Sequence, residues 1–107
     1  MSYFIVIRGP GPSWDDSHPL REQAGWAEHA KFMNTLADVG FIRLGGPLGD
    51  GSRSLHIVEA DRDASIRARL ADDPWTSMGI LRIVSIEPWE ILLGEVPPRW
   101  LPRAGSE

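Results

Sequence analysis

His29 is the side chain of this sequence best suited to proton transfer. It lies in residues 25–47 (GWAEHAKFMNTLADVGFIRLGGP), a stretch that joins an amphipathic helix to a strand. At 100° per residue, His29 falls between Met33 and Leu36 in the apolar stripe of that helix. A histidine, whose unperturbed pKa is about 6.5, can exchange a proton near neutral pH. Once buried, the ring needs a hydrogen-bond partner, so the alternative is a structural histidine that donates to a backbone carbonyl.

Asp73 is the candidate partner of His29. It stands directly before Pro74 and follows the second predicted helix. A carboxylate on the far ring nitrogen would fix the tautomer of the histidine and raise its basicity. We therefore predict a hydrogen bond between the two side chains, with heavy atoms about 2.6 to 3.2 Å apart. The alternative for Asp73 is a turn carboxylate that bonds to the backbone near the proline.

Further side chains are candidates for substrate binding. Arg8 ends a predicted central strand and Arg53 begins another, so either guanidinium could hold a substrate carboxylate as a fork. The alternative for both is a solvated charge. Trp26 and Trp75 belong to a set of five tryptophans, which suits an apolar pocket. His56 is either a further substrate contact or a cross-strand surface residue.

A metal centre is a weaker interpretation of the same residues. His29, His56 and Asp73 together would make a two-histidine, one-carboxylate ligand set. The sequence has no cysteine and therefore no thiolate ligand. We predict neither a metal nor a cofactor.

The predicted elements that must position these residues follow the order βαββαβ. Strands are predicted at residues 3–8, 41–45, 54–60 and 80–86, and helices at residues 23–39 and 64–71. Residues 9–22 form a long connection of the kind that is functional or lies at an interface, and residues 46–53 form a glycine-rich turn. Residues 89–93 form either a short fifth strand or an extension of the last strand at the edge of the sheet. This order predicts an α+β sandwich, an antiparallel sheet with two helices on one face.

Local signals mark the ends of the helices. Gly40 stands where the first helix should end in a left-handed residue. Asp61 or Asp63 can cap the second helix, in which Ile66 and Leu70 form the buried pair. Pro74 disfavours the helical conformation at Asp73, so this helix should end near residue 72.

The second face of the sheet predicts a homodimer. Residues 3–8 (YFIVIR) and 80–86 (ILRIVSI) are apolar on both faces, whereas the helices cover only one. An uncovered apolar face of more than a few hundred Å² marks an interface, so we expect two subunits to pack sheet against sheet. The Pro-rich tail lacks a local partner for its apolar residues, and we expect Trp100 to reach across the dimer.

Length and composition limit the class of protein. The 107 residues fit one domain, predicted at residues 1–94, with a tail at residues 95–107. The net charge of −4 and the scattered basic residues argue against nucleic-acid binding. No stretch has the apolar length of a membrane span or of a signal peptide. We therefore expect a cytoplasmic protein without a membrane or nucleic-acid partner.

The sequence resembles the YCII-related family of dimeric α+β barrel proteins. The similarity rests on the first strand, on the helix with His29 and Gly40, and on two corners, residues 45–47 (GGP) and 73–75 (DPW). The resemblance implies a ferredoxin-like βαββαβ subunit, a dimer made by facing sheets, and a histidine–aspartate pair that maps onto His29 and Asp73. Trp75 stands where the family usually has tyrosine or a similar aromatic residue. The best-known activity of the family, which the resemblance implies, is that of a dehydrochlorinase acting on a chlorinated hydroxymuconate.

Two classes of function follow from these residues. One is a small, cofactor-free lyase or isomerase in which His29 and Asp73 move a proton on an unsaturated or halogenated carboxylate. The other is a non-enzymatic dimeric module that binds a small ligand or assists another protein. A hydrogen-bonded His–Asp pair beside a pocket favours the first.

Overall fold

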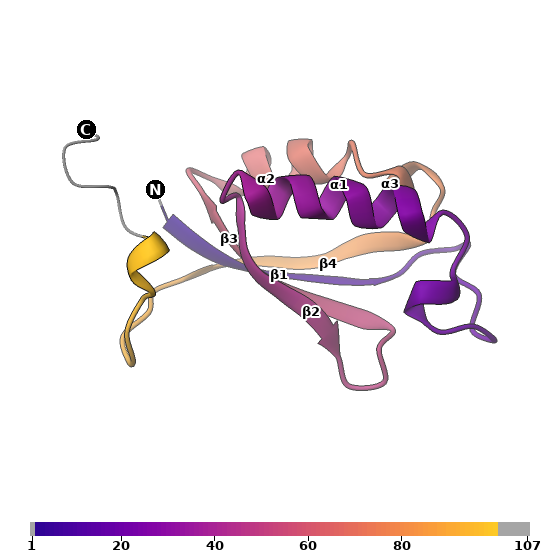
Figure 1. Cartoon of the computed structure of the whole chain (residues 1–107), viewed down its shortest axis with the longest axis horizontal. Coiled ribbons are helices and arrows are strands. Elements are labelled where there is room, and N and C mark those ends of the chain that lie inside the picture. Colours follow the sequence, from indigo (N-terminus) through magenta and orange to yellow (C-terminus); the bar gives the residue numbers. More distant parts are fainter. Residues whose placement is uncertain (1, 101–107) are drawn as a thin grey trace.

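The computed structural model describes residues 2–100 and contains four strands and three α-helices (Figure 1). The strands are β1 (Ser2–Pro10), β2 (Ile42–Leu48), β3 (Arg53–Ala60) and β4 (Leu81–Trp89). The helices are α1 (Trp26–Asp38), α2 (Asp63–Leu70) and α3 (Pro74–Ser77), with the 3-10 turns η1 (Leu20–Glu22) and η2 (Pro98–Trp100). The predicted βαββαβ order is confirmed, with α3 as an addition.

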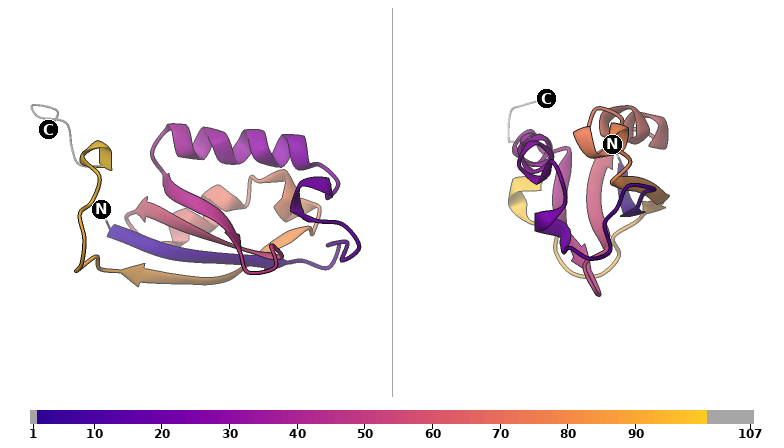
Figure 2. Two further views of the ribbon diagram at one scale, coloured as in Figure 1. Left: turned by 60° about the horizontal axis from the view of Figure 1, so that its bottom comes forward. Right: turned by 90° about the vertical axis from the view of Figure 1, so that its right-hand side faces the viewer.

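The four strands form one antiparallel sheet in the order β2-β3-β1-β4. This order is that of a ferredoxin-like fold, so the α+β fold class is confirmed. The helices lie on one side of the sheet, with α1 beside α2 (Figure 2). The site residues of β1 and β3 therefore point toward a helical layer.

The alternation of side chains along the two central strands determines which of them face the helices. Val6 pairs with His56 on β3 and with Ile86 on β4, and residues opposite one another share a face. Along β3, residues 54, 56, 58 and 60 are buried, as the period-two pattern predicted. The residues of the other face remain half-buried or exposed: Tyr3, Ile5, Ile7, Leu44, Leu55 and Ile57.

The core has two parts. The larger packs the sheet against α1 and α2, and its buried members are Phe4, Val6, Leu36, Ile42, Val58, Ala60, Ile66 and Leu70. The smaller lies at the α3 end and consists of Trp75, Ile80 and Leu81, with Trp14, Leu20 and Trp26 packed against it. The predicted buried pair of Ile66 and Leu70 is confirmed.

All four strands are longer than predicted. Strand β1 continues through Gly9 and Pro10, which were expected in the long connection but pair with β4. Residues 46–48, expected in a turn, pair with β3, and the turn itself begins at Gly49. Pro88, expected to interrupt the last strand, lies within β4, which borders only β1; a proline is tolerated on such an edge strand. Of the two alternatives for residues 89–93, the fifth strand is wrong, and the extension of the last strand reaches only Trp89, where β4 ends.

The ends of the helices differ in detail from the prediction. Helix α1 begins at Trp26 rather than residue 23, after Gly25, whose φ of 76° lies in the left-handed region. Gly40 has φ of 82°, as predicted for a helix C-terminus. The predicted cap of α2 by Asp61 or Asp63 is wrong, because Arg62 is the N-cap residue and no side chain caps the helix.

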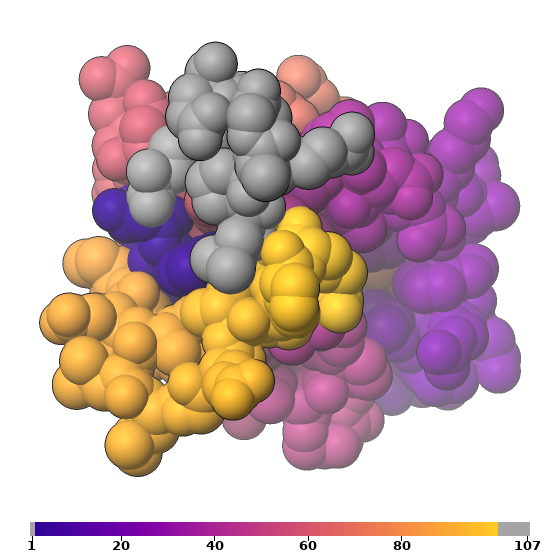
Figure 3. Space-filling model, turned by 60° about the vertical axis from the view of Figure 1, so that its left-hand side comes forward, coloured from indigo at the N-terminus to yellow at the C-terminus, as the bar shows by residue number. Residues whose placement is uncertain are grey.

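The tail returns to its own chain. Trp100 is 6% exposed and packs at a tilt on Tyr3, with ring centroids 5.6 Å apart. In Figure 3 the yellow segment that ends at Trp100 lies at the same end of the molecule as the indigo start of β1. The expectation that Trp100 lacks a local partner is therefore wrong, and the predicted reach across a dimer, which depended on it, loses its support. The rest of the tail lies outside the described residues.

None of the described helices is long and apolar enough to cross a membrane.

Candidate functional site

His29 and Asp73 form the predicted hydrogen bond. The Nδ1 atom of His29 lies 2.8 Å from Oδ2 and 3.0 Å from Oδ1 of Asp73. The distances fall within the predicted range, and both residues are buried, at 7% and 1% exposure. A pair that is 44 residues apart in sequence is thus brought together by α1 and the corner before α3.

Asp73 also receives two other donors. Its Oδ2 accepts from Nη1 of Arg8 at 2.7 Å, and its Oδ1 accepts from the backbone N–H of Trp75 at 2.9 Å, as the N-cap of α3. Burial alone would raise the pKa of Asp73, but the hydrogen bonds from His29, Arg8 and Trp75 hold that pKa below its ordinary value of 3.8. Asp73 is therefore both the turn carboxylate and the partner of His29, which the sequence analysis had treated as alternatives.

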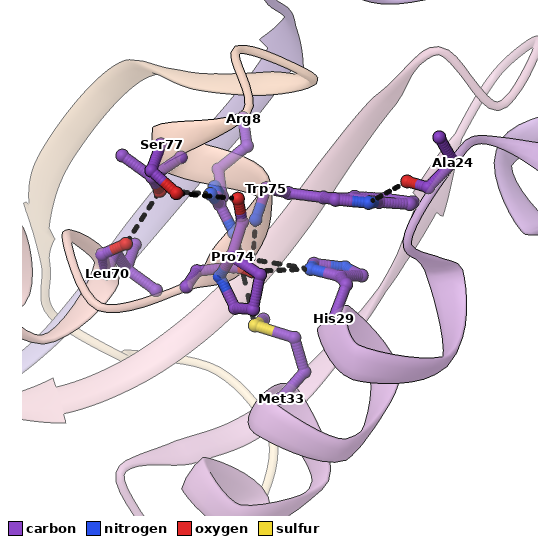
Figure 4. A network of polar contacts seen from close by, with 10 residues as sticks. Arg8, Ala24, His29, Met33, Leu70, Pro74, Trp75 and Ser77 are labelled. Carbon is purple, nitrogen blue, oxygen red and sulfur yellow. Dashed lines mark hydrogen bonds and ion pairs between the residues drawn. The ribbon is translucent and has the colours of Figure 1, made fainter.

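Trp75 stacks on the imidazole of His29. The ring centroids are 3.8 Å apart with an interplanar angle of 8°, and Figure 4 shows the two rings nearly parallel. Trp75 is fully buried, and its Nε1 donates to the carbonyl of Ala24 at 2.6 Å. This carbonyl precedes Gly25, where a Cβ would lie 3.3 Å from Nε1 of Trp75. These contacts hold the start of α1 against the indole ring of Trp75, which stacks on His29.

Arg8 lies in the interior of the protein, against Asp73 of the His29–Asp73 pair. Its side chain is fully buried, and Nη2 donates to Oγ1 of Thr76 at 3.1 Å. Thr76 in turn donates to the carbonyl of Leu70 at 2.7 Å. Nothing in this arrangement supports the predicted contact of Arg8 with a substrate carboxylate, because its side chain is fully buried and does not border the cavity described below.

A cavity of about 220 Å³ lies between α1, η1 and the β2–β3 side of the sheet. His29, Trp26 and His56 line it, together with Leu20, Arg21, Met33, Asn34, Gly45, Pro47 and Ser54. Because Nδ1 of His29 is taken by Asp73, Nε2 is the ring nitrogen left for a ligand. Of the six predicted site residues, three border this cavity: His29, Trp26 and His56. The other three, Asp73, Trp75 and Arg8, are buried and do not border it.

His56 contributes a second imidazole to the cavity. Burial lowers its pKa from 6.5 to about 4, and the positive charge of Arg8 acts in the same direction. His56 is therefore neutral at neutral pH. Within residues 2–100, no group of three or more histidine, cysteine, aspartate or glutamate side chains is arranged to hold a metal ion.

Sequence reasoning missed two polar contributors to the site. Arg21 lines the cavity with its guanidinium carbon 6.0 Å from the centroid of Trp26, and Thr76 anchors Arg8. The only signal for Arg21 was its place in the long connection before α1, which was expected to be functional. Nothing local marks Thr76, since its role depends on a contact with a residue 68 positions away.

Comparisons with known proteins agree with this fold. The family model of the YCII-related domain matches residues 1–90. No curated protein matches the sequence.

Among solved structures, the chain is similar to 5-chloro-2-hydroxyhydroquinone dehydrochlorinase from Burkholderia phenoliruptrix, in complex with 2,5-dihydroxybenzoquinone. The similarity has a TM-score of 0.59 at 24% identity and covers 86% of this chain and 95% of the other. The substrate in that enzyme's name is aromatic, unlike the chlorinated hydroxymuconate that the sequence resemblance implied. With most of its length matched by the family model, this chain belongs to the YCII-related family.

Proposed function

We propose that the protein is a small-molecule enzyme, a cofactor-free lyase or isomerase in which His29 transfers a proton on an unsaturated or halogenated carboxylate. The observation that carries the proposal is that the imidazole of His29 contacts a carboxylate through one nitrogen and also borders a cavity. Nδ1 lies 2.8 Å from the Asp73 carboxylate, while the ring borders a cavity of about 220 Å³. This is the arrangement of a base held in place by an orienting carboxylate.

The hydrogen bonds define which nitrogen reacts. An ionised carboxylate can only accept hydrogen bonds, and the lowered pKa of Asp73 keeps it ionised at neutral pH. In the neutral ring of His29, Nδ1 then carries the proton and Nε2 has the lone pair that the proposed reaction needs. Positive charge that forms on the ring when Nε2 takes up a proton is stabilised by Asp73.

The proposed reaction begins with removal of a proton from substrate by Nε2. In a lyase, the electrons of the broken bond to hydrogen form a double bond, and halide leaves with the electrons of the carbon–halogen bond. In an isomerase, the ring returns the proton to a different carbon. General acid–base catalysis of this kind contributes about 10²- to 10⁴-fold to a rate.

Binding of the substrate is assigned to the cavity walls. Trp26 offers an aromatic face. Among the described residues, Arg21 is the one positively charged side chain that borders the cavity. We therefore transfer the predicted role of carboxylate ligand from Arg8 to Arg21. Arg8 and Trp75 act instead as positioning residues for the pair.

A homodimer is part of the proposal. The face of the sheet away from the helices carries Ile5, Ile7, Leu55 and Ile57 half-buried and Leu44 at 50% exposure. A second copy packed on this face would remove these side chains from water, with an interface expected to exceed about 1,000 Å². We also retain a cytoplasmic location as a proposal, which the lack of cysteine favours.

The second candidate function is a dimeric module that binds a small ligand without transforming it. The limited volume of the cavity suits either function. Titration calorimetry should be combined with two assays of turnover: chloride release for chlorinated carboxylates and 5-chloro-2-hydroxyhydroquinone, and the change in ultraviolet absorbance for unsaturated carboxylates without a halogen. An enzyme should turn over a compound that it binds, and His29→Ala should reduce this turnover by about 10²- to 10⁴-fold. Binding without turnover across the panel would favour the module.

A further inference from the structure

His56 occupies a position that strand β2 leaves open for it. It lies on β3 opposite Gly45, and a Cβ at Gly45 would come within 2.6 Å of Cδ2 of His56. A side chain on β2 at this point would therefore displace the imidazole. The ring is 8% exposed and borders the same cavity as His29.

Neither ring nitrogen of His56 has a hydrogen-bond partner among residues 2–100. Nδ1 is fully buried without one. Nε2 is not enclosed in this way, so it is the nitrogen that keeps access to the cavity. Buried polar side chains in folded proteins almost always have a partner, and an imidazole without one, beside a cavity, is therefore suited to a ligand.

The environment also selects a tautomer. A neutral imidazole has one N–H and one lone pair, and His56 is neutral because burial lowers its pKa to about 4. For the backbone, a buried N–H without an acceptor is rarer than a carbonyl without a donor, and we apply the same preference to the ring nitrogens of His56. The lone pair is thus expected on the enclosed Nδ1, and the proton on Nε2.

We propose that His56 is a fixed hydrogen-bond donor, whose Nε2–H binds a carbonyl or hydroxyl oxygen of the substrate in the cavity. The proposal rests on the proposed function, because it gives this oxygen a role in the same reaction. When Nε2 of His29 removes a proton from a carbon conjugated with the oxygen, negative charge moves onto the oxygen. A donor already in place stabilises that charge.

The proposal narrows the substrate class. A neutral N–H suits an oxygen that becomes charged during the reaction, whereas the permanent charge of a carboxylate is better matched by Arg21. The expected substrate is therefore an unsaturated acid, or an equivalent ring compound, that carries a keto, enol or phenol oxygen next to the carbon that loses its proton.

The first test measures the tautomer in the ligand-free protein. Long-range ¹H–¹⁵N correlation spectra distinguish protonated from unprotonated ring nitrogens, and the chain has only three histidines to assign. We expect His56 to carry its proton on Nε2 at neutral pH. A proton on Nδ1, or on both nitrogens, would overturn the proposal whatever the enzyme does.

The second test measures binding of 2,5-dihydroxybenzoquinone, a ring compound with several oxygens, by calorimetry. His56→Met removes the donor and should weaken binding by about tenfold or more, whereas His56→Gln, which offers an amide N–H, should stay within about threefold of wild type. His18→Met, at an exposed histidine outside the cavity, is the matched control. Equal affinities of the wild-type and His56→Met proteins, or no binding by the wild-type protein, would overturn the proposal.

These readouts separate the two proposals. Both tests concern the tautomer and the affinity, neither of which requires turnover. If His56 donates as expected but no compound is turned over, the role of His29 fails while that of His56 stands.

Discussion

Replacement of Asp73 by asparagine tests how the site is held together. The substitution preserves size but removes the negative charge between Arg8 and His29. In the wild-type protein the carboxylate accepts from Arg8 at 2.7 Å, from His29 at 2.8 Å and from the N–H of Trp75 at 2.9 Å. The asparagine oxygen can retain part of these bonds, but its NH₂ group will face a donor, and the fully buried Arg8 will lose its counter-charge.

The expected loss of stability is large for this substitution. Removing one partner of a buried ion pair lowers the free energy of unfolding by about 3–5 kcal/mol. Since small domains have a total of about 5–15 kcal/mol, the variant should fold but unfold at a much lower urea concentration. The double variant Arg8→Met/Asp73→Asn, which leaves no isolated charge, should be more stable than Asp73→Asn alone.

Urea unfolding followed by tryptophan fluorescence and by circular dichroism gives the measurement. Asp72→Asn is the matched control, because Asp72 is an exposed neighbour, and it should change the free energy of unfolding by less than about 0.5 kcal/mol. The lowered pKa of Asp73 means that its contribution is complete above pH 3.8 and is lost as the pH falls below that value. A loss of less than about 1 kcal/mol in Asp73→Asn at pH 7 would refute the reasoning, since it falls far short of what a broken buried pair should give.

Three further predictions concern other parts of the chain. Because burial lowers the pKa of His56 from 6.5 to about 4, the unfolded state binds more protons in this range. The free energy of unfolding should therefore fall as the pH drops from 6.5 to 4, by at most about 3 kcal/mol; an equal slope in His56→Gln would contradict this. Ile57→Lys, on the open face of the sheet, should convert the proposed dimer to a monomer in analytical ultracentrifugation, and a wild-type protein that is monomeric at micromolar concentration would exclude the dimer. Trp100→Ala should lower the free energy of unfolding by about 1–3 kcal/mol through loss of its contact with Tyr3, and unchanged urea unfolding would show that the tail adds no stability.

The parts of the fold that sequence predicted well have strong local signals. Strand β3 alternates buried and open residues over its length, and α1 has a clear apolar stripe that ends at Gly40. The His29–Asp73 pair was expected because both residues match the family pattern. These features depend on one element or on one motif at a time.

The missed features depend on contacts between distant segments. Residues 45–47 (GGP) have the composition of a turn, yet pairing with β3 draws them into a strand. Helix α3 has only four residues, too few for a periodic pattern, although Asp73 followed by Pro74 is a helix N-terminal signal. Arg8 was expected at a substrate because its partner, Asp73, lies 65 residues away.

The most direct test of the account is chemical rescue of a protein that lacks the imidazole of His29. For a compound that the wild-type protein turns over, His29→Ala should reduce the rate by about 10²- to 10⁴-fold, the usual contribution of a general base. Because the substitution removes the ring that stacks on Trp75, it leaves space for a free imidazole. Added imidazole should therefore restore part of the rate of His29→Ala and should not raise the rate of the wild-type protein. Turnover by His29→Ala at the wild-type rate, without imidazole, would contradict the claim that His29 moves the proton.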